Sequence, residues 1–203
     1  MMKVSKSSDG KLRCQWSNTA PEFIHYHDKE WGFPVSQDIQ LFEKLCLESF
    51  QSGLSWRTIY NKRDNFRNAF CHFDFNKIAK FTTKDIKRLL SDPGIVRHRG
   101  KIEAVIHNAR QVQILIQQEG SLASFVWKYE PTKRPQQKSL VSTSPESITL
   151  SKELRKRGWK FVGPTTVYSF MQAMGLVNDH AQNCTTHSRV EAARKKFKRP
   201  KAS

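Results

Sequence analysis

The chain has 203 residues, of which 37% are hydrophobic and 26% are charged, and its formal net charge at pH 7 is +17. This length and composition suit one soluble globular domain, and no apolar run approaches the roughly 18 residues that span a bilayer, which argues against a membrane protein. The positive charge favours a polyanionic partner, because neutralised phosphates release condensed counterions; the alternative is a solubilising surface with a basic tail.

Both ends of the chain are expected to lie outside the folded domain. Residues 1–11 are rich in Lys, Ser and Gly and lack the apolar core of a signal peptide, which predicts a disordered basic leader on a cytoplasmic protein. Residues 188–203 are predicted to form a basic disordered tail, because part of the positive charge is concentrated in Arg194 to Lys201. The folded domain is therefore expected at residues 12–187.

Hydrophobic residues recur mostly at helical spacing, and strict alternation of apolar and polar residues is scarce. Helices are predicted at residues 38–51, after a capping box at 82–85, at 101–119 with Gly120 as the stop, at 152–157 with Ser151 as the cap, and from Pro164 to Gly175. Residues 130–146 are rich in Pro, Ser, Thr and Lys and predict a loop. The pattern as a whole predicts an all-α fold.

One acidic residue and three large aromatic residues gather around the first long helix. Glu48 lies on it among apolar neighbours, and Tyr26, Trp31 and Trp56 flank it in sequence. Aromatic faces can sandwich a flipped base and attract a cationic base more strongly than a neutral one. A buried carboxylate can accept hydrogen bonds from the base edge and oppose its positive charge. The alternative, which isolated residues of these types favour, is a set of core aromatics and a half-exposed Glu.

A glycine-flanked basic segment lies between two predicted helices. It consists of Pro93, Gly94, Ile95, Val96, Arg97, His98, Arg99, Gly100 and Lys101. The two glycines permit a tight connection, and the apolar pair could anchor it in the core. The amides of the turn and the next helix N-terminus would then face outward, beside basic side chains, in an arrangement that suits a phosphate. The alternative is an ordinary helix–helix turn with solvated charges.

Two Cys–His pairs lie near opposite ends of the chain, Cys14 with His27 and His180 with Cys184. The second pair is four residues apart, so both side chains can point from one face of a helical turn. Two thiolates and two imidazoles make a complete tetrahedral zinc set with no position left for water, which indicates a structural role. Buried cysteines and hydrogen-bonded histidines remain the alternative, because the spacing between the pairs does not establish contact.

The chain as a whole resembles the DNA-3-methyladenine glycosylase I family of the helix-hairpin-helix glycosylase superfamily. The segments that carry the resemblance span about residues 12 to 185 and are Arg13–Trp16, Tyr26–Gly32, Leu47–Trp56, Gly94–Ile102, Arg157–Pro164, Tyr168–Ala173 and Gly175–His180. The resemblance implies an all-helical base-excision repair enzyme that flips N3-methyladenine out of alkylated duplex DNA, and a monomer is the simplest expectation. Such an enzyme hydrolyses the N-glycosidic bond and releases free 3-methyladenine.

The resemblance also implies roles for individual residues. It makes Glu48 the residue that recognises the methylated base and is expected to carry catalysis, with Tyr26, Trp31 and Trp56 around the base pocket. It makes Gly94 to Lys101 a DNA-binding hairpin and suggests Leu54 as an apolar wedge in the duplex. Its zinc ligands match Cys14, His27, His180 and Cys184, so that one structural Zn²⁺ joins the N- and C-terminal regions; His187 is a competing ligand with poorer spacing.

The chemistry demands little acid catalysis, because N3-methylation gives the purine a positive charge and the base leaves neutral. Glu103 and Glu119 follow the hairpin but are more typical of solvated helix charges than of a catalytic acid. Lys101 raises the possibility of a lyase that forms a Schiff base, whereas the resemblance implies a monofunctional enzyme.

Three other functions are consistent with parts of the sequence. The first is a non-catalytic zinc-stapled helix-hairpin-helix module that binds DNA, which predicts a defective Glu48 pocket. The second is a zinc hydrolase, which requires an open coordination position. The third is a structural zinc protein that binds RNA through its basic tails.

Overall fold

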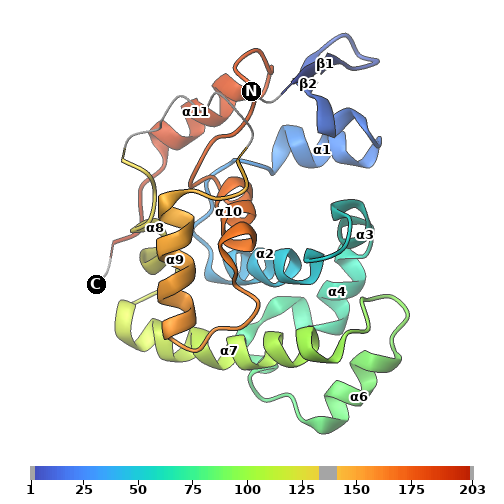
Figure 1. Ribbon diagram of the computed structural model, residues 1–203, viewed down its shortest axis with the longest axis vertical. Helices are drawn as coiled ribbons and strands as arrows, with labels where there is room; N and C mark the ends of the chain where they lie inside the picture. The colour runs from blue at the N-terminus through green and yellow to red at the C-terminus, as the bar shows by residue number, and fades with distance from the viewer. Residues whose placement is uncertain (1–2, 133–140, 202–203) are drawn as a thin grey trace.

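The computed structural model describes residues 3–132 and 141–201, and it is mostly helical (Figure 1). The helices are η1 (Gln15–Asn18), α1 (Glu22–Lys29), α2 (Asp38–Gln51), α3 (Trp56–Asn61), α4 (Arg63–Ala69), η2 (Cys71–Phe73), α5 (Phe75–Ile78), α6 (Thr83–Ser91), α7 (Arg99–Glu119), α8 (Leu122–Trp127), α9 (Pro145–Lys156), α10 (Pro164–Ala173) and α11 (His187–Lys196). Two short strands, β1 (Val4–Lys6) and β2 (Leu12–Cys14), pair in antiparallel fashion with Val4 opposite Cys14. The expectation of an essentially all-α fold is confirmed.

Helix α2 is the central element, and its bounds are those predicted from the sequence. Every residue from Leu41 to Phe50 except Glu43 is buried, and α3, α7, α8 and α10 pack around the helix. Its Phe42 and Phe50 are fully buried, and burial of such side chains contributes about 2 kcal/mol each. The helix is therefore a rigid platform for the polar groups that it carries.

The helix ends show which local signals were informative. Thr82 and Asp85 form the predicted capping box of α6, and Gly120 ends α7 with a φ of 81°. The prediction that Ser151 caps a short helix is wrong, because α9 begins earlier at Pro145 behind the cap residue Ser144. The Ser151 hydroxyl is buried inside the helix and donates to the carbonyl oxygen of Val162 at 2.6 Å.

The predicted loop at residues 130–146 is confirmed only where the structure describes it. Residues 131–132 and 141–144 are irregular, and residues 133–140 lie outside the described part of the chain. The final two residues of the predicted loop instead begin α9, where Pro145 occupies the first helical turn.

The N-terminal region differs from the expected disordered leader. Strand β1 pairs with β2, and the turn between them is held by Asp9, whose carboxylate accepts from the Arg13 guanidinium at 2.7 Å. Arg13 is buried and also donates to Asp28 of α1 at 2.8 Å. Strands of three residues are too short to show an alternation pattern, so neither strand was predicted.

The C-terminal region also differs from the expected disordered tail, because residues 187–196 form α11. Val190 is fully buried, and Arg194 donates to Glu130 and to the carbonyl oxygen of Leu176, both at 2.9 Å. Arg199 donates to the same Glu130 carboxylate at 2.8 Å. The run of positive charge suggested a solvated tail, so this helix was not predicted. In the structure, some of these cations instead form ion pairs with the folded domain.

The segment that leads into α11 meets the region of the two strands near the top of Figure 1. The backbone N–H of Thr185 donates to the carbonyl oxygen of Leu12 at 2.9 Å. Among residues 3–132 and 141–201, no helix combines the length and apolarity needed to cross a membrane.

Candidate functional site

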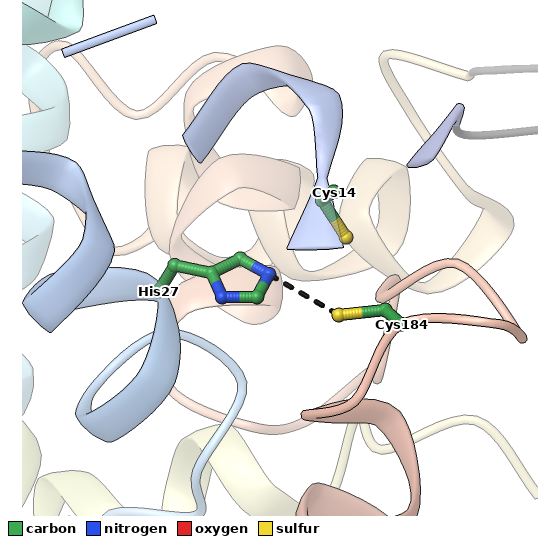
Figure 2. Close-up of side chains that lie close together, drawn as sticks. All are labelled: Cys14, His27 and Cys184. Atoms are coloured by element: carbon green, nitrogen blue, oxygen red, sulfur yellow. Dashed lines mark hydrogen bonds between the residues drawn. The ribbon is translucent and has the colours of Figure 1, made fainter. Parts of the chain in front are cut away.

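A cluster of sulfur and nitrogen ligand atoms lies where the chain ends meet. Cys14 at the end of β2, His27 on α1 and Cys184 after α10 are all buried, and their candidate ligand atoms lie within 4.8 Å of one another. The Nε2 atom of His27 is 3.4 Å from the Sγ atom of Cys184, and Figure 2 shows the His27 ring turned toward that sulfur, with the Cys14 sulfur alongside. The described residues therefore contain a three-residue grouping that can hold a metal ion.

His180 lies next to this grouping without belonging to it. Its ring centroid is 4.8 Å from that of His27, and its side chain is buried. The Nδ1 atom is 2.9 Å from Oδ1 of Asn178, whereas the buried Nε2 atom has no hydrogen-bond partner among the described residues. Burial lowers the pKa of His180 to about 4, so the ring is neutral at pH 7 and Nε2 offers a lone pair.

The partners of His27 fix the direction of its lone pair. Its Nδ1 atom is 2.8 Å from Oδ1 of Asp28. Burial raises the pKa of Asp28, but hydrogen bonds from Arg13 and His27 outweigh that effect and hold the pKa at about 2. Asp28 is therefore ionised at neutral pH and can accept a proton from Nδ1, which directs the Nε2 atom of His27 toward the sulfur atoms. Carboxylate or carbonyl partners of this kind orient metal-binding histidines.

The two thiols influence one another. Hydrogen bonds from the Cys14 thiol and from His27 favour the Cys184 thiolate and lower the pKa of Cys184 to about 3, against the effect of burial. The same contact and burial raise the pKa of Cys14. The two sulfurs and the His27 imidazole are donors of the kind that a soft, tetrahedral metal ion prefers, and His180 is a neighbouring imidazole.

A cavity of about 540 Å³ is lined by residues of α1, α2, α3 and α4 and by Met174, which follows α10. Its apolar lining includes Tyr26, Leu47, Trp56 and Met174. The Tyr26 and Trp56 ring centroids are 5.5 Å apart with an interplanar angle of 39°. Trp56 also carries a buried Nε1 donor with no partner among the described residues. An aromatic recess with an unmet donor suits a planar heteroaromatic ligand.

Trp31 lies on the metal-ligand side of this recess. Its ring centroid is 4.6 Å from that of His180, and its side chain is 7% exposed. It packs in one buried cluster with Tyr26 and Ala173 and does not line the cavity. Trp31 therefore connects the Cys–His cluster to the wall behind Tyr26.

Glu48 is buried on α2, and its carboxylate is 2.9 Å from the Lys44 ammonium. Lys44 also donates to the Tyr26 hydroxyl at 2.7 Å and lies 3.7 Å from the centroid of the Trp56 ring. Burial lowers the pKa of Lys44, although the Glu48 charge opposes that effect. Burial raises the pKa of Tyr26, so its hydroxyl is protonated at neutral pH. Sequence reasoning missed Lys44; the available signal was its spacing four residues before Glu48.

The predicted hairpin connects α6 to α7. The Asp92 carboxylate accepts from the backbone N–H of Gly94 at 2.7 Å, and Ile95 is buried as the anchor of the turn. Val96 is partly buried against the core. Arg97, His98 and Arg99 are exposed, and Gly100 is half-buried in the first turn of α7.

Lys101 is placed differently from the basic residues before it. Its side chain is buried, and its ammonium donates to the carbonyl oxygens of Phe50 at 2.9 Å and Ser52 at 2.5 Å. Lys101 therefore caps the C-terminus of α2 and ties it to the start of α7. Burial lowers the pKa of Lys101.

Two exposed apolar side chains belong to the same region. Leu54 follows α2 and is 40% exposed, and Phe161 is 41% exposed with its ring centroid 6.3 Å from that of His98. Phe161 has a φ of 56°, an uncommon conformation for a bulky residue, and its carbonyl oxygen accepts from Ser49 of α2 at 3.0 Å. Phe161 was missed by sequence reasoning, because no pattern reports positive φ at a non-glycine residue.

Of the two glutamates after the hairpin, Glu103 is a surface charge, as predicted, whereas the Glu119 side chain is only 15% exposed. Glu103 is exposed and lies 3.3 Å from Arg99. Glu119 lies 2.6 Å from both Lys128 and Arg157 at the far end of α7.

Comparisons with known proteins identify close relatives of this chain. The family model described as methyladenine glycosylase matches residues 16–187. DNA-3-methyladenine glycosylase 1 of Escherichia coli is 46% identical over 177 residues, which cover 85% of this chain and 95% of that protein. The DNA-3-methyladenine glycosylase of Haemophilus influenzae is 43% identical over 177 residues, or 85% of this chain and 96% of that protein.

Solved structures agree with these relatives. A crystal structure of 3-methyladenine DNA glycosylase I superimposes with a TM-score of 0.80 at 48% identity, over 86% of this chain and 99% of the other. The enzyme from Staphylococcus aureus, described as showing the structural basis of 3-methyladenine recognition, gives a TM-score of 0.81 at 37% identity, over 86% and 95% of the two chains.

Proposed function

The chain belongs to the methyladenine glycosylase family and is a DNA-3-methyladenine glycosylase of base-excision repair, and we propose that Tyr26, Glu48 and Trp56 form its base pocket. The enzyme hydrolyses the N-glycosidic bond of N3-methyladenine in alkylated DNA. The observation that carries the assignment of the pocket is that Tyr26 and Trp56 line one cavity, with the buried Glu48 carboxylate held next to them through Lys44. Trp31 supports the pocket from behind, through its packing beside Tyr26.

The pocket residues act on the base rather than on the water. The flipped base stacks on Trp56, while Glu48 accepts hydrogen bonds from its edge and protonated Tyr26 is available as a donor. Water adds to the sugar carbon as the bond to the base breaks, the base departs neutral with the bonding electron pair, and the added water releases one proton to the solvent. Contacts that become stronger as positive charge moves from the base to the sugar lower the activation free energy of bond cleavage. No dedicated acid is then needed.

DNA is held by the α6–α7 hairpin, in the manner of the helix-hairpin-helix glycosylases. Gly94 to Gly100 present the turn and the α7 N-terminus to a backbone phosphate, and Arg97, His98 and Arg99 add exposed basic groups. Leu54 and Phe161 are apolar side chains that can enter the base stack beside the flipped nucleotide. The Lys101 ammonium is engaged by two carbonyl oxygens, which supports a monofunctional enzyme without a Schiff base.

A single structural Zn²⁺ is bound by Cys14, His27, His180 and Cys184. The buried Nε2 atom of His180 has no other partner, and the Nδ1 atoms of both histidines are held by Asn178 and Asp28, which supports this set of ligands. Four protein ligands leave no position for water, so the ion would supply a crosslink between β2, α1 and the segment after α10 rather than chemistry. Such a crosslink closes a loop that contains most of the chain, and it stabilises the fold because it lowers the conformational entropy of the unfolded chain. We expect the enzyme to act as a cytoplasmic monomer.

The test is release of bases from N-methylated duplex DNA, identified by chromatography, with Glu48→Gln as the variant and Lys84→Gln on the exposed face of α6 as the matched control. Selective release of 3-methyladenine by the wild type and the control, with a much slower variant, supports the role of Glu48. Equal release by all three proteins would remove Glu48 from catalysis. Folded, metal-loaded protein that binds DNA but releases nothing would instead support a non-catalytic DNA-binding module.

A further inference from the structure

Helix α11 and the segment after it carry a basic surface that lies outside the proposed glycosylase site. Residues 188–201 contain seven Lys or Arg residues and a single acid, Glu191, and they follow the last residue that the family model matches. The exposed cations of this segment are Arg189, Lys195, Lys196, Lys198, Arg199 and Lys201. These six residues are called the α11 basic surface below.

Most of these cations have no acidic partner. Arg199 is paired with Glu130 at 2.8 Å, and the single acid of the segment, Glu191, lies 3.7 Å from Arg194. Within residues 3–132 and 141–201, no ion pair engages the four lysines, which are Lys195, Lys196, Lys198 and Lys201. The surface therefore presents positive charge that the described chain does not neutralise, and such charge favours a polyanionic partner.

Contacts with the domain hold this surface in place. Val190 is fully buried on the inner side of α11, and the Phe197 ring packs against Trp127 of α8 with the centroids 4.6 Å apart. On the outer side, the exposed residue between the cations is the small Ala192, so a ligand can approach the helix closely. A fixed array of cations loses less conformational entropy on binding than a flexible tail does.

The position of α11 separates it from the proposed lesion site. Figure 1 places α11 and the chain end on the opposite side of the molecule from the α6–α7 hairpin, with α2 and α10 between them in that view. A helix with its side chains is about 10 Å across, whereas salt screens charges over about 8 Å at physiological ionic strength. The α11 basic surface therefore adds little to the electrostatic potential at the hairpin. Because duplex DNA is stiff over about 150 base pairs, a duplex seated at the hairpin reaches α11 only at a large cost in bending free energy.

We propose that the α11 basic surface binds the phosphate backbone of a second DNA duplex while the hairpin holds the first. Phosphates complement the unpaired lysines, and the DNA on which the enzyme acts supplies them at high local concentration. A protein that holds two duplex segments can pass from one to the other without dissociating. The enzyme thereby gains a route for lesion search between distant stretches of DNA. This inference goes beyond the glycosylase reaction and rests on the proposed hairpin only as the site of the first duplex.

The experiment removes the four unpaired lysines and compares the result with the loss of four scattered surface lysines. The variant carries Lys195→Gln, Lys196→Gln, Lys198→Gln and Lys201→Gln. The control carries the same change at four exposed positions elsewhere, Lys80→Gln, Lys84→Gln, Lys152→Gln and Lys156→Gln. Each protein is loaded on a short fluorescent duplex, and its dissociation is followed by stopped-flow anisotropy as unlabelled duplex is added in increasing excess.

Direct transfer makes dissociation depend on the competitor. With wild type and the control, the dissociation rate should rise in proportion to the concentration of unlabelled duplex, because the second duplex binds before the first leaves. With the variant, this dependence should be about tenfold weaker. Doubling the salt concentration should weaken binding of the second duplex to wild type about tenfold, as four phosphate contacts require.

Three results would overturn the inference. The first is a wild-type dissociation rate that does not depend on the competitor, and the second is an equal response of wild type and variant. The third is acceleration by RNA or polyglutamate but not by duplex DNA, which would assign the surface to another polyanion.

Release of 3-methyladenine from a short methylated duplex separates this inference from the proposed pocket. Wild type, variant and control should release the base at equal rates, because a short duplex occupies only the hairpin. Slower release by the variant alone would place α11 on the duplex that carries the lesion and would overturn the inference. A wild type that shows transfer driven by the competitor but releases no base supports the inference and overturns the proposed pocket instead.

Discussion

Asn178 accepts the Nδ1 proton of His180 through a 2.9 Å contact, which leaves the buried Nε2 atom of that ring available to a metal ion. Removing this partner frees the ring to rotate and to change tautomer. We therefore expect Asn178→Ala to weaken zinc binding by roughly 10- to 100-fold, the range typical of such partners. Competition with a colorimetric chelator measures the affinity.

The matched control for that prediction is Gln182→Ala, an exposed position in the same segment, which should retain the wild-type affinity. Removal of the metal by a chelator should also lower the melting temperature of the wild type. A zinc-free wild-type protein with an unchanged melting temperature and full activity would contradict the zinc proposal.

Lys101 is expected to act through stability rather than through covalent chemistry. Its ammonium caps carbonyl oxygens of Phe50 and Ser52, and charge-assisted hydrogen bonds of this kind contribute about 2 kcal/mol. Lys101→Met should lower the free energy of unfolding by about that amount in urea titrations. Borohydride should trap no covalent DNA adduct with wild type. A trapped adduct that disappears in Lys101→Met would instead establish a lyase.

The sequence predicted the long elements of the fold better than its ends. Residues 38–51 were predicted correctly, because burial around α2 enforces a dense helical pattern. The start of α9 was missed, because Ser144 and Ser151 are equally plausible caps and only packing against Val162 distinguishes them. In the parts of the two ends that the structure describes, β1 and most of α11 replace the expected disorder, held by long-range pairs such as Arg194 with Glu130.

The residues of the candidate site could also be predicted only in part from the sequence. Cys14, His27 and Cys184 are grouped by the fold, and spacing alone gave no evidence that the distant pairs would meet. Lys44 was overlooked, because an acid and a base four residues apart on a helix usually form a solvated pair. Its burial beside Tyr26 and Trp56 depends on elements on both sides of α2. Charge in a pocket is therefore the feature that sequence patterns report least well.

The C-terminal helix should contribute stability that depends on pH. Glu130 accepts from Arg194 and Arg199, and these hydrogen bonds lower its pKa despite the opposing effect of burial. A lowered folded pKa stabilises the protein above the unfolded value of about 4.3, and the contribution is lost as pH falls through the folded pKa. The stability advantage of wild type over Glu130→Gln should therefore shrink as the solution is acidified below that value. Thermal unfolding across a pH series measures it, and a constant difference would contradict the assignment.

Leu54 and Phe161 should matter for intact DNA and not for the free base. Both are exposed apolar residues near the ends of segments anchored on α2, and neither lines the cavity. Insertion of such side chains offsets the few kcal/mol needed to unstack a base, so Leu54→Ala and Phe161→Ala should each lower kcat/KM on methylated duplex about tenfold. Binding of free 3-methyladenine should be unchanged. Ile148→Ala, which removes a comparably exposed side chain from α9, is the control. Equal losses in free-base binding and duplex activity would place these residues in the support of the pocket instead of at the DNA.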